Sequence, residues 1–179
     1  HKNPIIKYSM NSYSLNRKAP NTSFKEAVIK GLAPDRGLYF PESIQPLPKI
    51  FFEDIEHHSY SEIAYETIKQ FVLPDIPEAE LKRIVEETLS FDFPIVQLNK
   101  SISTLELFHG PTMAFKDVGA RFMARCLGYF NQNNTEEVTV LVATSGDTGG
   151  AVAHGFLGVK GVKVVILYPS GKVSDIQEK

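Results

Sequence analysis

The C-terminal half of the chain alternates strand-like and helix-like segments in an order that few folds can accommodate. Two apolar, β-branched runs, "EEVTVLVAT" (136–144) and "GVKVVILYP" (161–169), flank the small-residue segment "DTGGAVAHGFLG" (147–158). Strands joined by a helix-length segment predict a parallel sheet with a crossover helix. Another helix is expected over residues 117–130, after the strand-like runs "PIVQLN" and "ISTLELF". We therefore expect this half to be the opening of a parallel-sheet α/β domain.

The N-terminal half predicts helices instead. Two capping-box patterns, Ser23–Glu26 and Ser59–Glu62, each precede residues with helical spacing, and Pro77 suits the first turn of a third helix. The segment "APDRGLYFPESI" between the first two helices predicts a loop. We expect a mostly helical domain over residues 1–92, followed by an incomplete α/β domain over residues 93–179. An open α/β sheet usually has more strands, so we expect the chain to be a fragment.

Composition excludes several classes of function. The net charge of −2 gives no reason to expect a nucleic acid or an anionic membrane as partner. No apolar stretch is long enough to span a bilayer, and the sequence shows no paired Cys or His pattern for a metal. The single cysteine, Cys126, fits a reducing compartment, so we expect a cytoplasmic protein.

Ligands of α/β sheets bind where strands end and helices begin. The turn "TSGDTGG" (144–150) occupies such a position, and its glycines let the backbone approach a ligand closely. Exposed N–H groups and the positive end of the helix favour an anion there. The spacing matches neither a Walker loop nor the GxGxxG pattern. The turn alone is equally compatible with a purely geometric use of the glycines, with Asp147 as a helix cap.

The second segment at a helix start is "HGPTMAFKD" (109–117). The helix dipole and burial beside Phe115 would both favour the uncharged amine of Lys116. An uncharged lysine amine is suited to bonding with a carbonyl group. From position alone, Lys116 and Asp117 could instead form an ordinary charged helix start.

Taken together, these two segments carry a resemblance to a known family. The stretch "FHGPTMAFKDVGARFM" followed by "ATSGDTGGAVAHGF" resembles threonine synthase, a fold type II enzyme family that uses pyridoxal 5′-phosphate (PLP). The stretches "SFKEAVIKGLAPDRGLYFPESI" and "VKVVILYPSGKVSDIQEK" are also similar to this family, so the resemblance runs from about Tyr8 to Lys179.

The resemblance implies a role for each matching residue. Lys116 matches the lysine that bonds covalently to PLP and later carries protons among the carbon atoms of the substrate. Phe115 would help to shape the cofactor pocket, and Asp147 would lie near the phenolic oxygen of PLP, where many fold type II enzymes have Asn. A further set would bind the substrate: Thr112, Thr144, Ser145, Gly146, Thr148 and Gly149.

The implied reaction converts O-phospho-L-homoserine and water into L-threonine and phosphate. The loop for the cofactor phosphate and the partner of its pyridine nitrogen are expected beyond Lys179, so these 179 residues alone are expected to be inactive. The sequence leaves open whether the protein is a monomer or a homodimer. Alternatives are another fold type II lyase (an amino acid dehydratase or a phospho-lyase), a non-catalytic folding or contact region, and a nucleotide-binding module.

Overall fold

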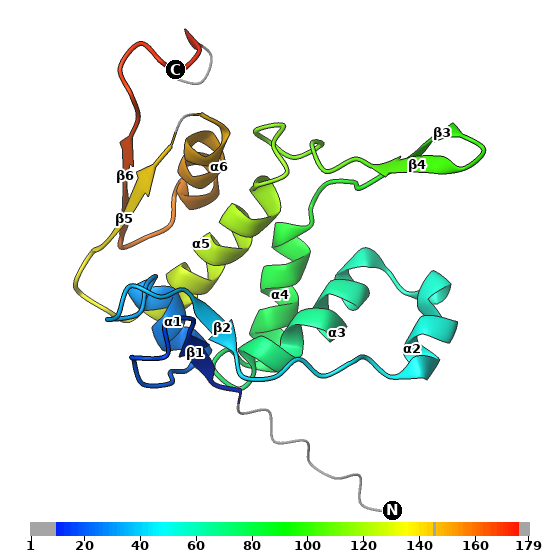
Figure 1. Cartoon of the computed structure of the whole chain (residues 1–179), viewed down its shortest axis with the longest axis horizontal. Helices are drawn as coiled ribbons and strands as arrows, with labels where there is room; N and C mark the ends of the chain where they lie inside the picture. Colours follow the sequence, from blue (N-terminus) through cyan, green and yellow to red (C-terminus); the bar gives the residue numbers. More distant parts are fainter. Residues whose placement is uncertain (1–9, 145, 176–179) are drawn as a thin grey trace, which may run out of the picture. The chain divides into compact units, whose positions relative to one another are not determined.

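The computed structural model describes residues 10–144 and 146–175 (Figure 1). The chain divides into two compact units, residues 1–86 and 87–179. The sequence analysis places the division after residue 92, and the assignment of its two sides as separate functional domains stays a prediction.

Helices predominate among the described residues up to 88. α1 (Phe24–Lys30), α3 (Tyr60–Val72) and α4 (Glu78–Thr88) lie where the sequence predicts them, and α2 (Lys49–Glu53) and the 3-10 helix η1 (Ile55–His57) are additional. The apolar faces of α3 and α4 and of the segment between them supply the core of this unit. Its buried members are Tyr65, Val72, Ile76, Leu81, Ile84 and Val85.

The start of α3 has both bonds of a capping box. The Ser59 hydroxyl accepts the N–H of Glu62 at 3.2 Å, and the Glu62 carboxylate accepts the N–H of Ser59 at 2.7 Å. These bonds satisfy donors that a helix start would otherwise leave unpaired. They also lower the pKa of the Glu62 carboxyl, with the Ser59 N–H as the largest cause and its hydroxyl next.

Removing this cap should destabilise the N-terminal unit. We expect Ser59→Ala to lower the free energy of unfolding by about 1 kcal/mol, measured by urea denaturation. The pKa of Glu62 is lower in the folded state than in the unfolded state. The ionised Glu62 carboxylate therefore stabilises the fold at pH values above its pKa in the unfolded state, and this stabilisation is lost as the pH falls through its pKa in the folded state. Ser61→Ala, in the same turn, is the matched control. Equal losses in the two variants would contradict the capping role.

A short antiparallel pair corrects the predicted loop. β2 (Tyr39–Pro41) lies within "APDRGLYFPESI" and pairs with β1 (Ser12–Ser14), with Ser12 opposite Pro41. The pairing joins residues far apart in the sequence, and strands of three residues carry no readable alternation. The local turn signals therefore favoured a loop.

The first two strands of the C-terminal unit form a hairpin. β3 (Ile95–Asn99) and β4 (Ile102–Leu105) pair antiparallel, and the Asn99 side chain accepts the N–H groups of Ser101 at 2.9 Å and Ile102 at 3.1 Å. The prediction that this region starts the parallel sheet is wrong for the described residues. The reason is that only two residues connect β3 to β4, and so short a connection permits only antiparallel pairing of these strands.

The predicted strand–helix–strand unit is confirmed. β5 (Val138–Ala143) and β6 (Val162–Leu167) run parallel in register, and α6 (Asp147–Phe156) connects them. α5 (Asp117–Asn131) packs against α6 (Figure 1). A Cβ built on Gly155 of α6 would lie 3.1 Å from the backbone of Ala120 in α5, so the two helices approach closely. The fold is the α/β class that the sequence predicts.

Cys126 lies within this helix layer. Its side chain is fully buried, and burial raises the pKa of its thiol to about 12. The thiol therefore stays protonated and unreactive at neutral pH. We expect a thiol-directed alkylating reagent to leave Cys126 unlabelled in the native protein and to label it after denaturation, as read by peptide mapping. Rapid labelling of the native protein would contradict this packing.

Candidate active site

The turn between β5 and α6 is organised by Thr144. The Thr144 hydroxyl oxygen accepts the N–H of Gly146 at 3.0 Å and the N–H of Gly149 at 3.1 Å. Gly149 is buried, and a Cβ built on it would lie 2.5 Å from the Thr144 methyl carbon. Gly146 has a φ of 157° with a ψ of −103°, a conformation favoured by glycine. Thus each of these two glycines has a local reason to be glycine.

Other predicted residues of this turn are placed as follows. Asp147 is exposed in the first turn of α6, and Thr148 beside it is half-buried. The N-cap residue Gly146 provides no side chain to the helix start. The prediction for Ser145 lies outside the described residues. The predicted roles of the whole turn in binding stay predictions.

Lys116 stands immediately before α5. Its Nζ lies 4.5 Å from the centroid of the Phe115 ring, and its backbone is helical, with φ −72° and ψ −13°. Among residues 10–144 and 146–175, no carboxylate lies within 4.0 Å of this amine and no hydrogen bond holds it. The alternative of an ion pair between Lys116 and Asp117 is therefore not formed within the described part of the chain.

The water-poor setting predicted for Lys116 is not formed by the described residues. Phe115 is 62% exposed and Lys116 is half-buried. The described part of the chain therefore provides one side of a pocket at most.

Asp117 and Thr112 are bonded to each other across the loop that holds Lys116. The Thr112 hydroxyl donates to one carboxylate oxygen of Asp117 at 2.6 Å, and the Thr112 N–H donates to the other at 2.9 Å. The Thr112 hydroxyl, predicted to bind substrate, thus donates its hydrogen bond to Asp117. Sequence reasoning missed this contact, because the bond between the two side chains depends on the fold of the loop and not on a local spacing rule.

Arg121 holds the start of α5 to the preceding segment. Its guanidinium donates to the carbonyl of Glu87 at 2.6 Å, to the carbonyl of Thr88 at 3.2 Å and to the hydroxyl of Ser90 at 2.8 Å. Burial is the main reason that the pKa of Arg121 is lowered. The spacing of four residues between Asp117 and Arg121 predicts an ordinary ion pair along the helix, but the guanidinium bonds to residues 87–90 instead.

The two predicted segments open at the same end of the C-terminal unit. α6 begins where β5 ends, and α5 begins at that same end (Figure 1). Close packing of Ala120 against Gly155 fixes one helix to the other. The geometry therefore places a lysine with no described ionic partner at the start of α5 and a glycine turn at the carboxyl end of β5, which is the edge where parallel sheets bind ligands.

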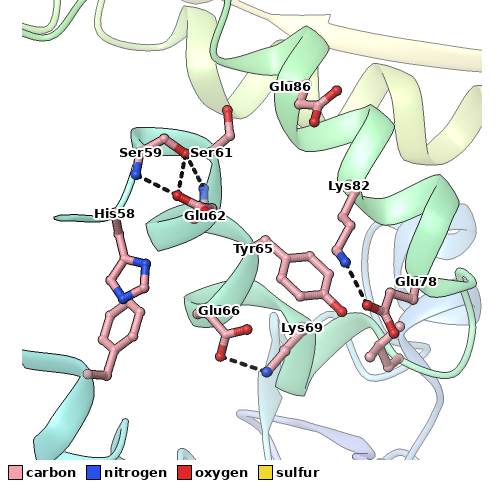
Figure 2. Close-up of a pocket in the computed structure, with 12 residues that line it drawn as sticks. His58, Ser59, Ser61, Glu62, Tyr65, Glu66, Lys69, Glu78, Lys82 and Glu86 are labelled. Carbon is pink, nitrogen blue, oxygen red and sulfur yellow. Dashed lines mark hydrogen bonds and ion pairs between the residues drawn. The ribbon is translucent and has the colours of Figure 1, made fainter. Parts of the chain in front are cut away.

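A separate hollow of about 680 Å³ lies in the N-terminal unit (Figure 2). Tyr65 lies between Lys69 and Lys82, whose Nζ atoms are 5.5 Å and 5.0 Å from the ring centroid. The two ammonium groups are paired with Glu66 and Glu78, respectively. Burial is the main reason that the pKa of Tyr65 is raised. This hollow contains none of the predicted site residues.

Comparison with known proteins shows what the chain is similar to. Residues 12–89 match a family model described as "Threonine synthase N terminus". Over 171 residues the chain is 42% identical to the threonine synthase of Buchnera aphidicola subsp. Baizongia pistaciae, an alignment that covers 95% of this chain. The threonine synthase of Escherichia coli is 40% identical over 170 residues, again 95% of this chain. The resemblance to threonine synthase is confirmed.

Solved structures agree with this relationship. A crystal structure described as PLP-bound threonine synthase from Brucella melitensis matches 94% of this chain with a TM-score of 0.87 at 38% identity, and the chain covers 38% of that structure. Threonine synthase from Escherichia coli matches with a TM-score of 0.86 at 40% identity and is covered to 39%. The chain spans about two-fifths of the length of its threonine synthase relatives.

Proposed function

We propose that the protein containing this chain is a threonine synthase, which converts O-phospho-L-homoserine and water into L-threonine and phosphate with PLP as cofactor. One observation supports this most strongly. The Lys116 loop and the glycine turn open at the same end of one α/β unit, in a chain that resembles threonine synthases over 95% of its length. We propose the isolated chain to be inactive, because it spans only 40% of that relative.

The described residues fit PLP in their chemistry. PLP carries an aldehyde, which requires a primary amine, and its substrate carries a carboxylate, which requires hydrogen-bond donors. Lys116 supplies an amine that no described carboxylate neutralises, next to an aromatic ring at 4.5 Å. The helix start at Asp147 is of the kind that favours an anion. Lys116, Phe115 and Asp147 are the residues that we expect to contact the cofactor.

When bound, PLP withdraws electrons from the carbon skeleton of the substrate and makes its carbon-bound protons acidic. Lys116 first holds the cofactor and then, as a free amine, accepts and returns protons at the substrate carbons. We expect the N–H and hydroxyl of Thr148 and the hydroxyl of Ser145 to hold the substrate carboxylate, whereas Gly146 and Gly149, whose N–H groups donate to Thr144, let the turn approach it closely. This arrangement keeps the α-carbon of the substrate within reach of the amine.

The hydroxyls of Thr144 and Thr112, the other two of the predicted set, already have partners within the protein. Thr144 already accepts two N–H groups of the turn, and Thr112 is bonded to Asp117. We propose that Thr144 shapes the turn that receives the carboxylate.

The remaining parts of the proposal concern the location and the partners of the protein. None of the helices among residues 10–144 and 146–175 combines the length and apolar character needed to cross a bilayer. No cluster of potential metal ligands occurs in the described part of the chain. We propose a cytoplasmic enzyme with a small-molecule substrate, either monomeric or homodimeric, with neither nucleic acid nor membrane as partner.

A substrate assay of the full-length protein tests the proposal. We expect PLP-dependent release of phosphate and threonine from O-phospho-L-homoserine, and no ammonia from serine or threonine. Ammonia release without phosphate release would identify an amino acid dehydratase, which would use the same lysine. Absence of both activities in protein shown to be PLP-loaded would overturn the proposal.

A further inference from the structure

Asp117 directly follows Lys116 and carries a carboxylate that the proposed chemistry does not use. The residue is 1% exposed. A buried carboxylate is strongly destabilising unless hydrogen bonds satisfy its oxygens. Here both oxygens accept from a single residue, Thr112, whose N–H and hydroxyl donate at 2.9 Å and 2.6 Å.

This pairing differs from ordinary helix capping. An acid that caps a helix accepts N–H groups of its own first turn. Asp117 instead accepts from the loop on the other side of Lys116, and so it closes the segment from residue 112 to residue 117 into a ring. Within and beside that ring, the N–H of Met113 donates to Gly110 and the N–H of Asp117 donates to Ala114, each at 3.0 Å.

The surroundings leave the carboxylate little room to move. A Cβ built on Gly110 would lie 2.5 Å from a carboxylate oxygen of Asp117 and 2.9 Å from the ring of Phe91. The guanidinium of Arg121 lies 5.7 Å from the centroid of that same ring and is bonded to the carbonyls of Glu87 and Thr88. The segment from residue 112 to residue 117, which the Asp117 bonds close, is therefore packed tightly against its neighbours.

Lys116 lies inside the closed segment, and its amine lies over the Phe115 ring with no described hydrogen-bond or ionic partner. Its carbonyl accepts the N–H of Ala120 at 3.0 Å, so α5 fixes its backbone from the C-terminal side. The bond from Thr112 to Asp117 fixes it from the N-terminal side. The backbone of Lys116 is thus held on both sides, while its amine has no described hydrogen-bond or ionic partner.

We propose that Asp117 and Thr112 form a clamp that positions Lys116 for its reaction with cofactor and substrate. This inference rests on the proposed function. Asp117 is a positioning residue in this view: it acts through the backbone of Lys116 and touches neither cofactor nor substrate. Misplacing a reacting group by about 1 Å can lower a rate about 100-fold, so a small loosening has a measurable effect.

The test compares two variants of Thr112 in the full-length protein. Thr112→Val keeps the shape but removes the hydroxyl that donates to Asp117, whereas Thr112→Ser keeps the hydroxyl. We expect Thr112→Val to lower kcat for O-phospho-L-homoserine by roughly 10- to 100-fold with little change in KM, and Thr112→Ser to restore most of it. Thr22→Val is the matched control, because its hydroxyl donates to the carboxylate of Glu26 at the start of α1.

A second measurement does not depend on activity. In the cofactor-free protein, backbone amides of residues 112–117 should exchange hydrogen roughly 10-fold faster in Thr112→Val than in the parent or in Thr112→Ser. Parental kcat and parental exchange in the valine variant would overturn the clamp. Equal loss of kcat in Thr22→Val would assign the effect to general stability and would also overturn it. If the parent protein releases no phosphate, the proposed function fails, and the exchange rates alone decide whether the clamp exists.

Discussion

Replacing Lys116 by alanine in the full-length protein is expected to lower PLP-dependent phosphate release from O-phospho-L-homoserine at least about 1000-fold. The reason is that one amine serves twice, as the group that holds the cofactor and as the group that moves protons. Lys116 has no described ionic partner whose loss could unfold the protein. The melting temperature should therefore stay near that of the parent, which separates loss of chemistry from loss of structure.

Two further lysine variants sharpen this result. Lys116→Arg keeps a positive charge at the helix start but cannot bond to an aldehyde as a lysine amine does, so we expect it to be as inactive as the alanine variant. Lys100→Ala, in the exposed turn between β3 and β4, should retain the parental rate. Substantial activity in Lys116→Arg would show that only the charge of Lys116 matters.

Gly149→Ala is expected to destabilise the C-terminal unit by about 1–3 kcal/mol. Its new methyl group would lie 2.5 Å from the methyl carbon of Thr144. Thr144 cannot withdraw without loosening its bonds from the N–H groups of Gly146 and Gly149. The variant should therefore also lose affinity for the anion that the turn is proposed to hold.

The neighbouring glycine provides the control for this variant. A Cβ built on Gly150 has no described atom within 4 Å. Gly150→Ala should then be neutral or stabilising by about 0.5–1 kcal/mol, because alanine is favoured over glycine within a helix. Urea denaturation should show a loss of stability in Gly149→Ala and no loss in Gly150→Ala. Equal destabilisation would contradict the close contact between Gly149 and Thr144.

The sequence predicts most closely those parts of the fold whose signals are local. Capping residues mark the starts of α1 and α3, and the apolar runs mark β5 and β6. The glycine turn and Lys116 can also be found from the sequence, because each lies at the start of a predicted helix, and α/β sheets bind ligands where strands lead into helices.

The parts that the sequence does not predict depend on distant partners. β2 forms because it pairs with β1 across a long separation, and periodicity over three residues cannot show this. Two of the contacts of Arg121 are with backbone carbonyls, those of Glu87 and Thr88, which carry no residue-type signal. Burial of Asp117 is likewise set by packing of Gly110 and Phe91 around it. The predicted burial of Lys116 beside Phe115 is not reached among the described residues, where Lys116 is half-buried and Phe115 is exposed.

The most direct test of the central claim is to locate the lysine that bonds to PLP. Full-length protein is titrated with PLP, reduced with borohydride and digested, and the labelled peptide is identified by mass spectrometry. We predict that the label lies on Lys116 and disappears in Lys116→Ala. A label on any other lysine, with Lys116 unmodified, would contradict the account.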